Sequence, residues 1–437
     1  MHKKITREVI NHLLPWQKKI LRASGAELVG ESSGLPDKYF DVDSGGYQQA
    51  RPFAFFTQKV QFHYIPNTPV ENRYKYWRVV ENKLGEPVKL SRFRYNRLDP
   101  AWKHLSQGFR FYLTQATARL KEGRITDFAG YLGSLLHILQ DATCYLHSLE
   151  GIDGTDILIL DRLLVSGEED FSRWPSYLLR ESPEGEVRLL TPQVVGTSIP
   201  EASFLLYSRL WQDVSANRRL LLPLYLALIN SDGSKIHQIR SEMLSRAGQL
   251  CLDVTHTVFG IAFERWSRSE LNALEMVYLS DLKAIREPLG LSEPYRFITF
   301  LQDASLNQKM QTCPLSLYLE EKPGQWRKRV FKKGLGTGSH YHYCLAYEIP
   351  AGVYRSFSGA VGLHADLGRG GNINVSIRLN RKSVFRERFT DRYPGKRFWI
   401  DLESGGLLEL VVTSDSGMRN ARNNVVWADL VLTKNNV

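Results

Sequence analysis

The spacing of apolar residues divides the chain into a helical part and a β part. Apolar positions recur every three or four residues, as in amphipathic helices, over segments 109–121, 126–148, 200–229 and 234–266. Thr126 and Asp127 precede the apolar run of the second segment and can cap a helix there. Pro183 and Pro192 mark a loop between helices. The first two thirds of the chain are therefore expected to be helical.

From about residue 310 the pattern changes to short apolar-rich runs separated by Gly, Asn and Asp turns. Segment 372–379 alternates polar and apolar residues, which is typical of a half-buried strand. Runs of this kind predict a β-sandwich; they cover 341–349, 358–365, 372–379, 397–402, 407–414 and 425–432. We therefore expect a multidomain protein, with an all-α domain over residues 1–276 and an all-β jelly-roll or sandwich domain over residues 277–437.

Composition narrows the class of protein. The 437 residues include 57 Lys and Arg against 46 Asp and Glu, a net charge of +11. With 43% hydrophobic and 24% charged residues, the amino-acid composition is that of a globular protein. This composition excludes a disordered, collagen-like or coiled-coil chain. The positive balance favours anionic partners, such as phosphodiesters or an anionic membrane surface. Because no apolar run is long enough to span a bilayer, any membrane contact is expected to be peripheral.

Two further features concern location and redox chemistry. Residues 1–8 contain no apolar stretch of the signal-peptide kind. We therefore expect the protein either to stay in the cytoplasm or to be secreted with its leader removed. No CxxC pair is present, so neither a disulfide framework nor a Cys-based zinc site is expected from the four cysteines, Cys144, Cys251, Cys313 and Cys344.

Residue types that carry chemistry gather on one expected helix. His137 and Asp141 are four positions apart, so they share one face of that helix. An imidazole and a carboxylate at this spacing can hold one metal ion. His147 can face the same cavity if the helix continues. The helix is otherwise nearly all apolar, and a buried carboxylate is costly unless it is paired or bound to metal. The alternative is a set of satisfied core residues.

Three residues elsewhere are candidate partners of that helix. His2 opens an amphipathic N-terminal helix, and Asp37 follows a proline in a loop. His63 lies in an aromatic segment that can form one wall of a cleft. Each also has an ordinary explanation: a solvated terminal histidine, a turn residue and a partly buried stacked ring.

The candidate metal-binding residues lie in a pattern that resembles a known family. The pattern Tyr-Leu-Gly-x-x-x-His-x-x-x-Asp-x-x-x-x-x-His over residues 131–147 is similar to the metal-binding helix of the zinc-dependent phospholipase C family, whose wider fold includes the S1/P1-type nucleases. The N-terminal His-x-x-Ile-Thr, the loop Leu-Pro-Asp and the segment His-Tyr-x-Pro follow in the order of that family. The resemblance covers roughly residues 1–160.

This resemblance implies an all-α fold that binds two or three zinc ions. It implies that one ion has four ligands, Asp37, His63, His137 and Asp141. Asp141 would bridge to an ion bound through His2, and His147 would anchor a third. A carboxylate suits the bridging role because it has two oxygens. Asp37 is also the expected catalytic residue, since it can orient or deprotonate the attacking water.

Two departures from the family bear on the metal sites. Members with a processed N-terminus use the amino group and carbonyl of the first residue as ligands, whereas here His2 directly follows Met1. The third ion normally gains a downstream histidine, and none follows His147 closely. Candidate substitutes are Glu150, Asp153, Asp156, Asp253 and His256. A two-metal enzyme or a carboxylate-rich third site fits this sequence, and His256 can instead be a helix-packing residue.

The C-terminal part is similar to the NPCBM-type carbohydrate-binding module over about residues 277–437. Segments 333–339, 347–354, 357–363 and 427–430 carry this resemblance. It implies a glycan partner, and Trp326 and Trp399 are candidates to stack on a sugar. The histidines of this part, His340, His342 and His364, are expected at the surface rather than in a metal site.

The sequence therefore favours an enzyme, a zinc-dependent phosphodiester hydrolase of phospholipase C type. Its expected substrate is a phospholipid head group, and its second domain is expected to bind a glycan or a surface. Aromatic residues near His63 can contact a choline-type head group by cation–π attraction or stack on a base, or simply form core. The alternatives are a single-strand nuclease of the same fold and a catalytically inactive glycan-binding or adhesion protein.

Overall fold

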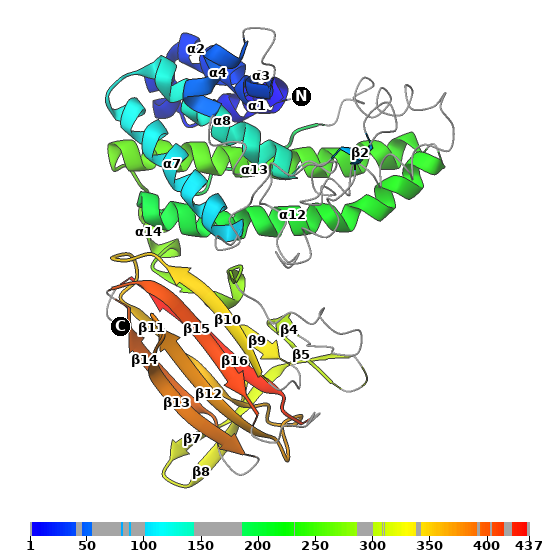
Figure 1. The fold of residues 1–437 in the computed structure, drawn as a ribbon, viewed down its shortest axis with the longest axis vertical. Helices are drawn as coiled ribbons and strands as arrows, with labels where there is room; N and C mark the ends of the chain where they lie inside the picture. Colours follow the sequence, from blue (N-terminus) through cyan, green and yellow to red (C-terminus); the bar gives the residue numbers. More distant parts are fainter. Residues whose placement is uncertain are drawn as a thin grey trace. The chain divides into compact units, whose positions relative to one another are not determined.

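The computed structural model of the chain forms two compact units, Met1–Trp266 and Ser267–Val437 (Figure 1). The division falls shortly before the expected boundary between residues 276 and 277. The expected order, a helical domain followed by a β-sandwich, is confirmed. The structure describes residues 2–40, 46–54, 80–81, 87–88, 101–143, 186–230, 232–285, 300–307, 309, 311–337, 342–390, 394–402, 404–414 and 422–434.

The first unit is built from helices, with one short β-pair. The helices are α1 (His2–Asn11), α2 (Pro15–Ser32), α3 (Leu35–Phe40), α4 (Gly46–Ala54), α7 (Ala101–Lys121), α8 (Ile125–Thr143), α12 (Ile199–Ile229) and α13 (Gly233–Phe263). The two short strands are β1 (Val80–Glu81) and β2 (Pro87–Val88). Apolar periodicity correctly predicted α7, α12 and α13, and it predicted α8 as far as Thr143, where the described residues stop. No helix among the described segments is long and apolar enough to cross a membrane.

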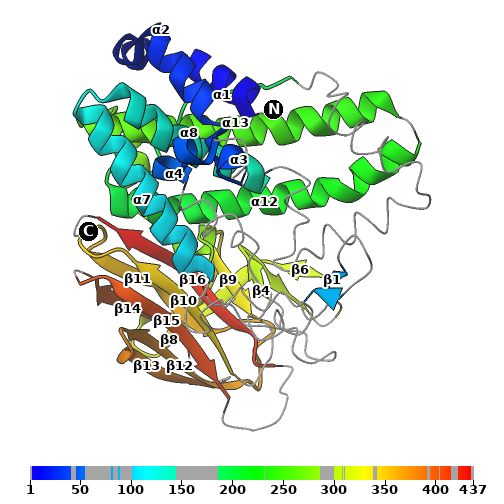
Figure 2. The same cartoon turned by 45° about the horizontal axis from the view of Figure 1, so that its top comes forward.

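Helix α8 is the core of this unit. Almost every side chain from Phe128 to Thr143 is buried, because α8 packs against α2, α7, α12 and α13. Figures 1 and 2 show α12 and α13 as long helices that lie side by side. The Phe128 and Phe259 rings meet edge to face and join α8 to α13. The central helix is therefore shielded from water on most sides, so its polar side chains need partners inside the protein.

An extended segment, residues 186–195, is fixed along α13 by a polar stripe. Side chains four positions apart lie on one helix face, and here five of them accept hydrogen bonds from backbone N–H groups of the segment. The acceptors, at distances of 2.7–3.2 Å, are Ser241, Ser245, Gln249, Asp253 and Thr257. Val187 and Leu189 of the segment then pack over Gly248. The stripe supplies the partners that the backbone of an isolated extended segment lacks.

The second unit is a two-layered β structure. One sheet has the strand order β10-β15-β12-β13, and the other has β14-β11-β16-β9-β4 with β3 beside β16. Their strands are β3 (Met276–Tyr278), β4 (Phe300–Gln302), β9 (Gly334–Thr337), β10 (His342–Ile349), β11 (Ser356–Leu363), β12 (Asn372–Leu379), β13 (Lys382–Thr390), β14 (Lys396–Asp401), β15 (Gly406–Thr413) and β16 (Val425–Thr433). Each of the predicted strand runs is found among them.

Smaller elements complete this unit. They are α14 (Arg268–Ala273), the turn η1 (Leu279–Asp281), the pair β5 (Ser305–Leu306) and β6 (Thr312–Cys313), and the hairpin β7 (Leu315–Lys322) and β8 (Gln325–Phe331). The core of the unit contains Trp427, whose ring is fully buried and whose Nε1 donates a hydrogen bond to the Tyr343 hydroxyl at 3.0 Å. A large ring with a satisfied N–H anchors such a core well.

Candidate metal centre

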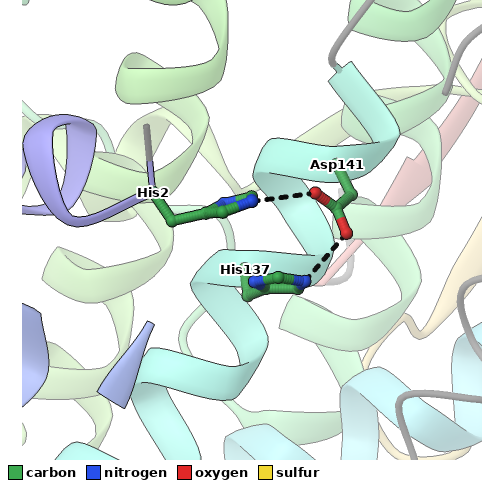
Figure 3. Close-up of side chains that lie close together, drawn as sticks. All are labelled: His2, His137 and Asp141. Atoms are coloured by element: carbon green, nitrogen blue, oxygen red, sulfur yellow. Dashed lines mark ion pairs between the residues drawn. The ribbon is translucent and has the colours of Figure 1, made fainter. Parts of the chain in front are cut away.

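Three side chains of metal-ligand type meet where α1 lies against α8 (Figure 3). His2 comes from α1, and His137 and Asp141 come from consecutive turns of α8. Their ligand atoms all lie within 4.8 Å of one another. Within the described part of the chain, this is the one group of three or more His, Cys, Asp or Glu residues with such spacing.

A glycine brings the backbone of residues 32 and 33 against α8. A Cβ on Gly133 would lie 2.6 Å from the Ser32 carbonyl carbon and 2.8 Å from the Ser33 nitrogen, closer than real carbon atoms approach. The bare glycine lets the Ser33 carbonyl oxygen come within 2.8 Å of His137 Nδ1. Since a carbonyl oxygen only accepts, Nδ1 must donate, and the lone pair of this imidazole is left on Nε2.

The second imidazole has the same arrangement. His2 Nδ1 lies 2.8 Å from Gln140 Oε1, which also only accepts, so His2 likewise carries its proton on Nδ1. Figure 3 shows both rings directing Nε2 toward Asp141. His2 Nε2 is 3.2 Å from Oδ1, and His137 Nε2 is 2.9 Å from Oδ2. The two rings stack with their centroids 4.1 Å apart.

These contacts leave the buried Nε2 of His137 unprotonated in the neutral ring. The His137 side chain has 0% exposure. Asp141 Oδ2 lies 2.9 Å from this Nε2, which makes no hydrogen bond within the described part of the chain. A lone pair and a carboxylate oxygen repel each other unless a cation lies near both. Zinc takes imidazole nitrogen and carboxylate oxygen, and catalytic zinc sites often have three protein ligands, so the residues present fit a zinc ion.

The charged groups around His137 also favour a cation at this site. Burial lowers the pKa of His137, but the carboxylates of Asp141 and Asp37 and the Ser33 carbonyl outweigh it, so the pKa of His137 is raised. The surroundings of this ring therefore stabilise positive charge, whether a proton or a metal ion supplies it.

Asp37 lies at the rim of the cluster. It is in the first turn of α3, and its Oδ1 is 3.6 Å from His137 Nε2. Its side chain is 68% exposed, so the carboxylate reaches both the cluster and solvent.

The other candidates from the sequence lie apart from this group. His256 is buried in α13, and its Nδ1 is 2.8 Å from Gln17 Nε2. Asp253 accepts hydrogen bonds from the Gln193 backbone and from Arg209, each at 2.8 Å. The remaining candidates fall outside the described residues and stay predictions; they are His63, His147, Glu150, Asp153 and Asp156.

In the second unit, one expectation was wrong. His364 is buried instead of lying at the surface. Its Nε2 donates to the Pro314 carbonyl at 3.0 Å, and its Nδ1 accepts from the backbone N–H of Asp366 at 3.1 Å. The ring therefore closes a turn. Of the other two histidines, His340 and the side chain of His342 lie outside the described residues.

Sequence reasoning missed two groups that hold the imidazoles. Ser33 acts through its backbone carbonyl, which leaves no signal in the sequence. Gln140 did leave one, because it is a polar residue directly before Asp141 on a helix that is otherwise apolar.

Comparisons with known proteins bear mainly on the second unit. Residues 275–433 match the family model described as NPCBM/NEW2 domain. No curated protein matches the sequence. Among solved structures, CBM51 from Clostridium perfringens GH95 in complex with methyl-galactose is 23% identical, with a TM-score of 0.30, and the match covers 36% of this chain and 99% of that one.

Two alpha-toxins are similar over nearly the whole length. The Clostridium perfringens protein from an avian strain is 9% identical with a TM-score of 0.30, and the match covers 99% of this chain and 98% of that one. The Clostridium absonum protein is 9% identical with a TM-score of 0.31, and the match covers 100% and 94%. Likenesses at these scores do not bear on activity. The family match, by contrast, confirms the expected NPCBM-type C-terminal domain.

Proposed function

We propose that the protein is a zinc-dependent phosphodiester hydrolase of phospholipase C type. One observation carries the proposal: each oxygen of Asp141 faces an imidazole Nε2 whose own Nδ1 already donates to an acceptor. This donor set suits a divalent cation. The resemblance of residues 131–147 to the phospholipase helix and the net charge of +11 support an anionic phosphodiester substrate.

Zinc held by His2, His137 and Asp141 would supply a Lewis acid for a phosphoryl oxygen and lower the pKa of water. Side chains and backbone groups of the protein would orient the ligands and transfer the proton. The Ser33 carbonyl and Gln140 would hold the two rings, and the exposed Asp37 carboxylate would take a proton from attacking water. The described cluster accounts for one ion, and further ions would need His63, His147 or Asp156.

The test compares zinc content and hydrolysis in wild type, Asp141→Asn and Asp127→Asn. Asp127 lies on the same helix but pairs with Arg124, away from the cluster, and so serves as the control. We expect Asp141→Asn to lose zinc and hydrolysis of short-chain phosphatidylcholine together, and Asp127→Asn to keep both. Wild-type protein with less than one zinc per chain after zinc-replete purification would overturn the proposal.

The choice of substrate is tested in the same experiment. Single-stranded DNA is assayed beside phosphatidylcholine, and we expect the lipid to be cleaved faster. Preference for DNA would reassign the site to the nuclease branch of the fold. Bound zinc with neither activity would favour a binding protein.

We further propose that the second unit binds glycan, which the NPCBM match supports. Trp326 and Trp399 are 47% and 59% exposed, so either ring can reach a sugar. A glycan array probed with wild type, Trp326→Ala and Trp399→Ala tests both positions. Unchanged binding in both variants would remove these two residues from the glycan site.

A further inference from the structure

Gln140 joins the metal cluster to hydrogen bonds in α1 and α13. Its side chain is buried, and its Oε1 accepts from His2 Nδ1 at 2.8 Å. Its Nε2 donates to Thr6 Oγ1 at 2.9 Å and lies 3.8 Å from Cys251 Sγ. The two ends of the carboxamide therefore face different partners.

The Cys251 sulfur favours this orientation of the amide. Cys251 Sγ donates to the Leu136 carbonyl at 3.7 Å, so toward Gln140 the sulfur acts as an acceptor. If the amide turned over, its oxygen would face that sulfur and its NH2 group would face His2 Nδ1. The turned amide would lose the Nε2 contact to Cys251 Sγ, because the oxygen would face a sulfur whose proton already goes to the Leu136 carbonyl.

This orientation decides where His2 carries its proton. With Gln140 as acceptor the proton is on Nδ1, and the Nε2 lone pair faces Asp141 Oδ1 at 3.2 Å. Without that acceptor, the other tautomer would be favoured, because Nε2–H could donate directly to the Asp141 carboxylate. That hydrogen bond would compete with a metal ion for both groups.

We propose that Gln140 is a positioning residue that holds His2 in the metal-binding tautomer. The inference rests on the proposed metal centre. Hydrogen bonds to the second nitrogen of a ligating histidine commonly fix its tautomer, and their loss typically weakens metal binding about 10–100-fold.

A second Gln–His pair in the same unit provides a matched control. Gln17 Oε1 accepts from the Leu14 backbone N–H at 3.0 Å, so its Nε2 faces His256 Nδ1 at 2.8 Å. Here the amide donates and the ring accepts, the reverse of the pair at His2. Because His256 lies outside the cluster of His2, His137 and Asp141, the Gln17→Met variant loses a similar buried contact without touching that cluster.

The experiment measures the zinc dissociation constant of the full chain by chelator competition, and the ring nitrogens of His2 in zinc-free protein by 15N NMR. We expect Gln140→Met to bind zinc about 10–100-fold more weakly and to move the His2 proton to Nε2. Gln140→Glu keeps an accepting oxygen and should keep the Nδ1–H tautomer. Gln17→Met should bind zinc as the wild type does.

Each outcome decides the inference. If Gln140→Met keeps the wild-type zinc affinity or the wild-type tautomer, the inference is overturned while the metal centre stands. If wild type itself binds no zinc, the metal centre fails and the inference fails with it. Should Gln140→Met not fold, Gln140→Leu takes its place, and an unchanged His2 tautomer in that variant would likewise overturn the inference.

Discussion

Gly133→Ala tests whether the approach of the Ser33 backbone holds His137 in place. The new methyl carbon would lie 2.6 Å from the Ser32 carbonyl carbon, whereas carbon atoms in contact are about 3.5 Å apart or more. Residues 32 and 33 must therefore retreat by about 1 Å. The Ser33 carbonyl, now 2.8 Å from His137 Nδ1, would then lie beyond hydrogen-bonding distance.

Two costs follow from this displacement. Overpacking of a filled core costs about 1–3 kcal/mol, and an unsatisfied buried donor at Nδ1 costs about 1–3 kcal/mol more. For a unit of this size each kcal/mol lowers the melting temperature by about 2–4 °C, so the decrease should be at least about 4 °C. Zinc affinity should also fall about 10–100-fold, because His137 loses the bond that orients its ring.

The assay is calorimetric unfolding together with chelator competition for zinc. Gly30→Ala is the matched control, since Gly30 is also a helical glycine but a Cβ there has no neighbour within 4 Å. That variant should be unchanged or stabilised by up to about 1 kcal/mol. If both variants melt and bind zinc alike, the close approach at Gly133 is not what positions His137.

Three other predictions concern the metal centre and the second unit. Asp141→Asn should lose zinc yet leave the unfolding of the β unit unchanged, which elemental analysis and calorimetry would show; retained zinc would contradict the assigned ligand. Chelation of zinc should destabilise the helical unit by about 2.7 kcal/mol relative to protein with free zinc at 100 times the dissociation constant, and a melting temperature independent of zinc would count against a bound ion. Trp427→Ala should cost the sandwich about 3–5 kcal/mol in denaturant unfolding without changing the zinc content, because this ring is fully buried.

Periodicity predicted the elements whose buried and exposed faces follow it. Helices α7, α12 and α13 carry apolar residues every three or four positions, and β12 alternates strictly. Strand β8 was missed because almost all its residues are exposed and its sequence, QWRKRVF, has no apolar face. It is a strand because it pairs with β7, whose leucines are buried. Pairing between strands, and not local sequence, decides such an edge element.

Only part of the candidate site could be predicted from the sequence. The spacing of His137 and Asp141 on one helix could be read directly from the sequence, because four positions fix their relative placement. The approach of His2 depends on how α1 packs against α8, so only the resemblance to a known family suggested it. His364 was misjudged because its ring is buried against the carbonyl of Pro314, which is distant in the sequence, and local sequence does not encode such tertiary contacts.

What distinguishes this cluster from an ordinary core network is the position of its protons. A His–Asp pair inside a protein usually shares a proton through the nitrogen that faces the carboxylate. Here the Ser33 carbonyl and the Gln140 oxygen each accept a hydrogen bond from the Nδ1–H of one ring, so two neutral rings direct their Nε2 lone pairs at one carboxylate. Either a ring gains a second proton or a cation lies between them, and the raised pKa of His137 reflects this same demand for positive charge. A divalent ion meets it at all three residues at once, whereas a single extra proton can satisfy only one ring.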